Sequence, residues 1–128
     1  MRNYEDLHVW QKAHILTLAI YKATRCFPNE ERFGLTSQIR RSSASIGANL
    51  AEGCGRRFDD EMARFVHIAM GSGAELSYHL RLAWDLDLLS KSTAEELWSD
   101  LNEVMRMLSS LSLKLEPRTE VVQLRAKG

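Results

Sequence analysis

The sequence is poor in the residues that interrupt or cross-link a chain. It has only two prolines in 128 residues, whereas Leu, Ala, Glu, Lys, Arg and Met are common, which favours helices over strands. Its two cysteines, Cys26 and Cys54, stand apart from each other and from any CxxC or Cys/His spacing. This excludes a disulfide framework, and we expect two reduced thiols that pack as small apolar residues.

Long apolar runs are also missing. None approaches the roughly 18 residues that a membrane-spanning helix needs, and the segment from Met1 to Asp6 is too polar for a secretory signal. We therefore expect a cytoplasmic protein with no membrane partner. With 45% hydrophobic residues, the chain suits one domain around one core.

Motifs for catalysis, metals and cofactors are absent as well. Carboxylate-bridged di-iron bundles need a Glu-x-x-His pair on each of two helices, and the sequence does not supply two. Glu75 and His79 lack an evident third ligand, so we expect a pair on a helix surface. There is no GxSxG motif, phosphate loop or Cys/His nucleophile. The sequence predicts no enzyme, no cofactor, no metal site and no small-molecule substrate.

The net charge is zero, but the two halves of the chain differ. Up to Arg57 there are nine Lys or Arg against five Asp or Glu, and after it eight against twelve, so the halves carry about +4 and −4. This asymmetry fits a nucleic-acid-binding face. It equally fits halves, or neighbouring subunits, that meet by complementary charge.

Apolar periodicity predicts two helices in the first half of the chain. Asp6 is placed to cap the first, which continues to Pro28. The second begins between Glu31 and Leu35 and ends near Gly55. A glycine there can take the left-handed conformation that closes a helix.

Two more helices are predicted in the second half. The third begins near Phe58 and continues for about thirty residues, with acidic residues in its first turn. The fourth starts at a capping box formed by Ser92 and Glu95 and ends at Pro117. Residues 1–117 are expected to form the bundle domain, and residues 118–128 to be a disordered tail.

Small side chains dominate the second helix. Nearly half of the side chains in residues 38–57 are tiny, and they occupy two faces, so we expect this helix to be packed between neighbours. Gly71-Ser72-Gly73 lies inside the third helix, where two glycines cost roughly 1.5–2 kcal/mol relative to alanines. We expect this segment to lie level with residues 38–40 and to allow close contact.

Several helices carry more apolar surface than one core can bury. The fourth helix has a stripe spaced four, three, four, three, four, which is typical of a left-handed bundle: Leu97, Leu101, Val104, Leu108, Leu111 and Leu115. Trp98, Met105 and Ser112 form a second stripe beside it, and Val9, Ile15 and Leu18 lie off the main stripe of the first helix. This excess predicts a homo-oligomer.

Short stretches in a fixed order resemble a known bacterial family. They are Asp6-Leu7, Val9-Trp10-Gln11-Lys12-Ala13, Ile20-Tyr21, Phe27-Pro28, Phe33-Gly34-Leu35, Gln38-Ile39-Arg40-Arg41-Ser42, Ser45-Ile46, Asn49-Leu50-Ala51-Glu52-Gly53 and Gly71-Ser72 with Glu75. From about Asp6 to Leu115 the set is similar to the four-helix-bundle proteins encoded in intervening sequences of 23S rRNA genes. That family is related to the accessory variability protein of diversity-generating retroelements.

The resemblance implies a fold, an assembly and a set of partners. The implied fold is all-α, an antiparallel up-down four-helix bundle, and the implied assembly is a ring-like homopentamer. In the retroelement relatives, the implied role is binding a reverse transcriptase and its template RNA. For the intervening-sequence branch it implies only a connection with RNA.

Two functions therefore remain open. The first is a non-enzymatic, homo-oligomeric scaffold or adaptor, with structural or interface roles for Arg41, Asn49, Glu52, Gly47, Gly53, Gly71 and Glu75. The second is an RNA-binding accessory protein, for example a partner of a reverse transcriptase. Its phosphate contacts would come from Arg56, Arg57, Arg40, Lys12, Lys22 and Arg25.

The two arginine pairs of the second helix are expected to differ. Arg40 and Arg41 lie within the packed segment, and losing one member of a buried ion pair costs roughly 3–5 kcal/mol. We therefore expect at least one of them to meet a carboxylate from another helix or subunit, with Glu61 and Glu75 as candidates. The second pair, at residues 56 and 57, follows glycines and is expected to be more exposed.

Overall fold

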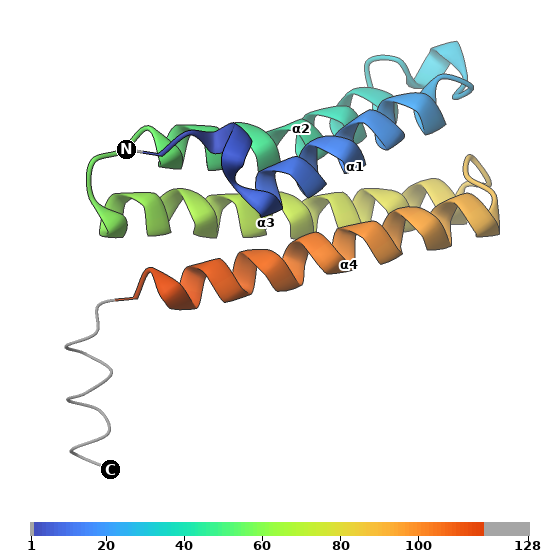
Figure 1. The fold of residues 1–128 in the computed structure, drawn as a ribbon. Coiled ribbons are helices and arrows are strands. Elements are labelled where there is room, and N and C mark those ends of the chain that lie inside the picture. The colour runs from blue at the N-terminus through green and yellow to red at the C-terminus, as the bar shows by residue number, and fades with distance from the viewer. Residues whose placement is uncertain (1, 117–128) are drawn as a thin grey trace.

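The computed structural model describes residues 2–116, and this part of the chain is helical without strands. Short connections join four long helices (Figure 1): α1 (His8–Thr24), α2 (Leu35–Cys54), α3 (Asp59–Asp85) and α4 (Lys91–Lys114). Single turns of 3-10 helix, η1 (Tyr4–Asp6) and η2 (Asn29–Glu31), precede α1 and α2. The all-α class and the four helices are thus confirmed. The tail, residues 118–128, lies outside the described residues.

The start of α1 differs from the expectation. Asp6 does not cap α1, because it lies inside η1. The cap of η1 is Asn3, whose Oδ1 accepts a hydrogen bond from the amide of Glu5 at 3.0 Å. The α1 helix follows without a side-chain cap, and its buried face consists of Val9, Ala13, Leu16, Ile20 and Thr24.

The end of α2 also corrects a prediction. The helix begins and ends within the predicted limits, but Gly55 has a φ of −77°, so the left-handed closure is wrong. Other amides donate to the last carbonyls of α2. The amide of Gly55 donates to the carbonyl of Glu52 at 3.1 Å, and the amide of Arg2 donates to the carbonyl of Cys54 at 2.9 Å. Because these donors satisfy the helix end, no left-handed residue is required.

The start of α4 lies two residues earlier than the predicted capping box. The cap is Ser90 in place of Ser92, and its Oγ accepts the amide of Thr93 at 3.2 Å. Asp87, with a φ of 59°, turns the chain sharply after α3, which shortens the connection. The apolar stripe of α4 is confirmed, since five of its six residues are buried and Leu111 packs against the core.

The helices enclose one core. Each helix packs against two others, in the order α1, α2, α3, α4 and back to α1 (Figure 1). The largest side chains that are fully buried between them are Leu16, Ile20, Ile39, Ile46, Leu50, Met62, Leu76, Leu80, Leu101 and Leu108. Across residues 2–116, no helix combines the length and hydropathy that crossing a bilayer demands.

Candidate subunit interface

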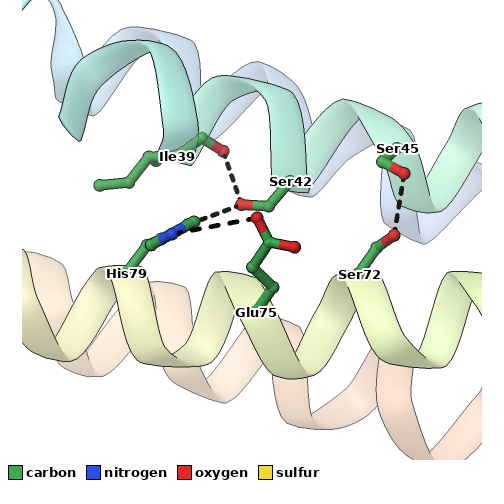
Figure 2. Close-up of polar contacts among 6 residues, drawn as sticks. All are labelled: Ile39, Ser42, Ser45, Ser72, Glu75 and His79. Carbon is green, nitrogen blue, oxygen red and sulfur yellow. Dashed lines mark hydrogen bonds and ion pairs between the residues drawn. The ribbon is translucent and has the colours of Figure 1, made fainter. Parts of the chain in front are cut away.

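Polar side chains join α2 to α3 along one seam (Figure 2). The hydroxyls of Ser45 and Ser72 lie 2.8 Å apart. Nearer the start of α2, Oγ of Ser42 lies 3.2 Å from Nδ1 of His79 and donates a hydrogen bond to the carbonyl of Ile39, also at 3.2 Å. Which of the two atoms, Oγ of Ser42 or Nδ1 of His79, donates to the other depends on the imidazole tautomer.

This seam corrects the expected register of α3 against α2. Gly71-Ser72-Gly73 was expected level with residues 38–40, but Ser72 lies beside Ser45. The prediction placed the chain reversal at Gly55. Residues 55–58 all lie between the two helices, so α3 starts later and is displaced along α2.

Ser42, His79 and Glu75 have the order of a hydrolytic triad, but their burial does not fit that use. Oε1 of Glu75 lies 4.0 Å from Nε2 of His79. Ser42 and His79 are both buried, so a substrate cannot reach the hydroxyl. The sequence predicted that Glu75 and His79 form a pair on the helix surface. This is wrong for His79, because only Glu75 is exposed. Within residues 2–116, no group of three His, Cys, Asp or Glu is placed to hold a metal ion.

We expect acid to weaken the fold through His79. Burial lowers the pKa of His79 below its usual 6.5, Glu75 opposes this shift, and Arg41 reinforces it. Below about pH 6.5, His79 is protonated in the unfolded chain but stays neutral in the folded chain. This difference holds until the pH falls to the lower pKa of His79 in the folded state. In that window the free energy of unfolding falls by up to about 1.4 kcal/mol per pH unit, and above it His79 has no effect.

Denaturant unfolding at about pH 7.5 and about pH 5.5 measures this loss. The control is His79→Gln, which keeps a hydrogen-bonding side chain for Ser42 but does not titrate. The wild-type protein should lose more stability between the two pH values than the variant does. An equal loss in both proteins would contradict the role of His79.

Close approach between helices explains two glycines. A Cβ on Gly53 would lie 3.0 Å from Cβ of Phe65, so this glycine lets α2 approach α3, as expected. A Cβ on Gly73 would collide with Sδ of Met105, so this glycine makes room for α4. Both glycines are buried within the protomer.

Small residues are exposed on both α2 and α3. On α2, Ala44 and Ala48 are exposed. On α3, no atom lies within 4 Å of the position that a Cβ on Gly71 would take, so the close contact expected there is absent from the protomer. Ile68, one turn before Gly71, is 42% exposed.

A groove of about 390 Å³ lies between α1 and α2. Its floor is formed by small residues of α2, namely Ala44, Gly47, Ala48 and Ala51. Its α1 side is mostly aromatic, and the rings of Trp10 and His14 stack with centroids 4.9 Å apart. A Cβ on Gly47 would lie 3.3 Å from Nε1 of Trp10, so the glycine lets the indole approach α2. We call this feature the α1–α2 groove.

The outer side of α1 exposes two large apolar side chains. Ile15 and Leu18 are 61% and 57% exposed, although every other Ile and Leu of α1 is buried. The prediction that they lie off the buried stripe is confirmed, but the same prediction is wrong for Val9, which is 4% exposed and belongs to the core. We call this pair the α1 ridge.

The charged and amide residues expected at an interface lie near these surfaces. Arg41 is exposed and forms no ion pair among residues 2–116, so the carboxylate expected for it is absent from the protomer. Asn49 is half-buried and donates to the carbonyl of Ser45 at 2.8 Å. Glu52 forms an exposed ion pair with Arg56 at 2.8 Å.

Arg40 finds its partners on α1. Its Nε donates to Oγ1 of Thr24 at 2.9 Å, and its guanidinium lies 4.7 Å from the centre of the Tyr21 ring. Neither contact involves a carboxylate. The guanidinium is therefore held by a hydroxyl and an aromatic face, which the sequence spacing did not indicate.

The basic residues proposed for phosphate binding do not gather in one place. Lys12 pairs with Glu103 of α4 at 3.4 Å. Positions 40 and 56 lie far apart, because position 40 is in the first half of α2 and position 56 is two residues beyond its end. Lys22 and Arg25 are exposed at the end of α1 where Arg40 lies, whereas Arg57 is exposed near the opposite end of α2.

Sequence reasoning missed the α1–α2 groove. The signal was the spacing of Trp10, His14, Thr17 and Tyr21, which repeats at four, three and four residues and places all four on one side of α1. The buried apolar stripe of α1 lies beside them and has the stronger periodicity, so the aromatic pattern was not recognised as separate.

Comparison with known proteins shows the family of this chain and solved structures of similar fold. Residues 5–110 match the model of the 23S rRNA-intervening sequence protein family. A crystal structure of a protein with unknown function from the S23 ribosomal protein family, from Bacteroides thetaiotaomicron, is similar with a TM-score of 0.76 and 26% identity. The similarity covers 81% of this chain and 94% of that one. The comparison with curated proteins produced no match.

Proposed function

This chain belongs to the 23S rRNA-intervening sequence protein family, and on that premise we propose that it is a non-enzymatic, homo-oligomeric scaffold or adaptor of the cytoplasm. We further propose that its helices form an antiparallel up-down bundle and that the bundles close into a homopentameric ring. Contacts in opposite order along α2 and α3 support the bundle, since Gly53 meets Phe65 whereas Ser42 meets His79.

The α1 ridge is the observation that carries the proposal. Ile15 and Leu18 expose neighbouring branched side chains on a helix whose buried face is already complete. Full burial of such a side chain contributes about 1.5–3 kcal/mol. Exposed apolar surface that lies beside a preformed groove is typical of a protein contact. A second copy of the chain supplies such a contact without another gene product.

Sedimentation equilibrium at micromolar concentration tests the proposal. We expect a particle with several times the 14.6 kDa mass of one chain, five times for the pentamer. A monomer would refute the oligomer. A dimer or another small assembly would refute only the pentamer.

Replacing Gly71 with alanine is expected to stabilise the protomer but to weaken the assembly. Alanine is about 1 kcal/mol more favourable than glycine inside a helix, and no atom obstructs the added methyl group. At dilutions where the protomer dominates, stability should rise by about that amount. In the assembly, the methyl group would separate subunits that pack closely on Gly71.

Denaturant unfolding and sedimentation of the same samples check both effects. The matched control is Gly73→Ala, whose methyl group meets Met105 and should bring no such gain. A more stable Gly71→Ala protomer with unchanged association would show that Gly71 faces solvent in the oligomer.

One observation favours the second candidate function, RNA binding. Lys22, Arg25 and Arg40 lie at the same end of the α1–α2 pair, and Lys22 and Arg25 are exposed. Three neighbouring cations suit a phosphate backbone, and such binding weakens steeply as salt is added. This role is compatible with an oligomer, because a ring would present several copies of the cluster.

RNA affinity measured over a salt series tests this second role. We expect Lys22→Ala with Arg25→Ala to lower the affinity and to flatten the salt dependence by about one unit of slope per lost phosphate contact. Arg56→Ala with Arg57→Ala makes the same change of charge at the other end of α2. If only that pair weakens binding, the phosphate site lies there instead.

A further inference from the structure

We propose that the α1 ridge of one copy packs into the α1–α2 groove of a neighbouring copy, with Leu18 seated between Ala44 and Ala48. The inference rests on the proposed homo-oligomer and names the two different surfaces that meet in it. Both surfaces belong to the same chain, so every copy offers one ridge and one groove.

The shapes of the two surfaces are complementary. On its α2 side the groove is lined by three alanines and one glycine, and on its α1 side by larger, mostly aromatic residues. The ridge presents two branched side chains three residues apart on a straight helix. Rows of side chains spaced by three or four residues on one helix fit between the rows of another. Ala44 and Ala48 are themselves spaced by four, and so leave the gap that such a row fills.

The charges beside the two surfaces are complementary as well. Lys22 follows Leu18 by one turn of α1 and forms no ion pair among residues 2–116. The carboxylate of Glu75 is exposed, and its nearest basic group in the protomer is the buried ring of His79, at 4.0 Å. With Leu18 over Ala44 and Ala48 and the neighbour's α1 running opposite to α2, Lys22 reaches the level of Glu75.

Symmetry favours this head-to-tail contact over a two-fold one. Rotation about an axis along the helices gives all copies the same direction, so the neighbour's α1 runs opposite to α2 just as the protomer's own α1 does. A contact between two different surfaces continues from copy to copy, and it closes into a ring when the rotation between copies divides a full turn. The exposed positions of α4 are polar apart from Leu113, so α4 offers no comparable ridge.

Cysteine cross-linking tests the contact directly. All variants carry Cys26→Ser, because Cys26 is exposed, whereas the buried Cys54 is left in place. Leu18→Cys protein and Ala48→Cys protein are mixed, allowed to exchange subunits and treated with a short bismaleimide. We expect a covalent dimer from the mixture and none from either protein alone. Leu113→Cys mixed with Ala48→Cys is the control and should give none.

The outcomes separate this inference from the proposed function. An oligomer of normal mass that gives no Leu18→Cys/Ala48→Cys product would overturn the contact and leave the oligomeric scaffold standing. A product from Leu18→Cys alone would mean a two-fold contact and would also overturn it. A monomeric wild-type protein would remove the proposed function and this contact together.

Charge reversal gives a second test that needs no cysteine. Lys22→Glu should weaken self-association severalfold because it places two carboxylates side by side. Adding Glu75→Lys to the same chain should restore it, since each interface then regains one opposite pair. Failure of the double variant to recover, with both proteins folded, would argue against contact between these residues.

Discussion

Replacing Leu108 with alanine is expected to destabilise the protein by about 2–5 kcal/mol, through lost burial and the cavity left behind. Leu108 is 0% exposed in the apolar stripe of α4. A domain of this size typically unfolds with a free energy of about 5–15 kcal/mol, so the loss is a large part of the total. Denaturant unfolding at a fixed protein concentration measures it.

Leu113→Ala is the matched control for this change. It lies on the same helix, loses the same atoms and is 66% exposed, so its effect should stay within about 0.5 kcal/mol. Similar losses at the two positions would mean that Leu113 is buried in the assembly. A stable Leu108→Ala protein would contradict the core described for α4.

Changing both ridge residues, Ile15 and Leu18, to aspartate is expected to convert the oligomer into folded monomers. Burial of the two side chains accounts for about 3–6 kcal/mol, which corresponds to about a hundredfold to ten-thousandfold in the dissociation constant. Aspartate adds the cost of burying a carboxylate without a partner. The fold should survive, because neither side chain contributes to the core.

Sedimentation and circular dichroism on the same sample measure association and helix content for this variant. Leu113→Asp places the same charge on an exposed apolar position of α4 and should leave the oligomer intact. If the Ile15→Asp, Leu18→Asp protein keeps its mass, the ridge faces solvent in the assembly. Loss of the oligomer in both variants would indicate a nonspecific effect of added negative charge.

Helix identity was readable from local pattern, whereas helix ends were not. The buried stripe of α4 follows from spacing alone, because residues three and four apart must share a face. The predicted caps at Asp6 and Ser92 were wrong: Asp6 lies inside η1 and α1 has no side-chain cap, whereas Ser90 caps α4. The choice depends on where each connection turns. At the end of α2 the choice was made by the distant amide of Arg2.

The candidate interface could be predicted only in part. Ile15 and Leu18 stand off the core stripe in the sequence, and their exposure is confirmed. Gly71 was recognised as unusual for a helix, but its lack of neighbours within the protomer depends on the displacement of α3 along α2. The partners of Arg40 also come from another helix, and no spacing within α2 indicates them.

The sequence by itself determined the all-α class, the four helices, the apolar stripe of α4 and membership of the family. These properties follow from periodicity and from the order of short motifs, both of which are local. Only the tertiary structure decided that His79 is buried against Ser42, that Gly71 is open and that aromatic residues of α1 border a groove over α2. Those facts depend on the register between helices, which the connecting loops and the packing of distant side chains set together.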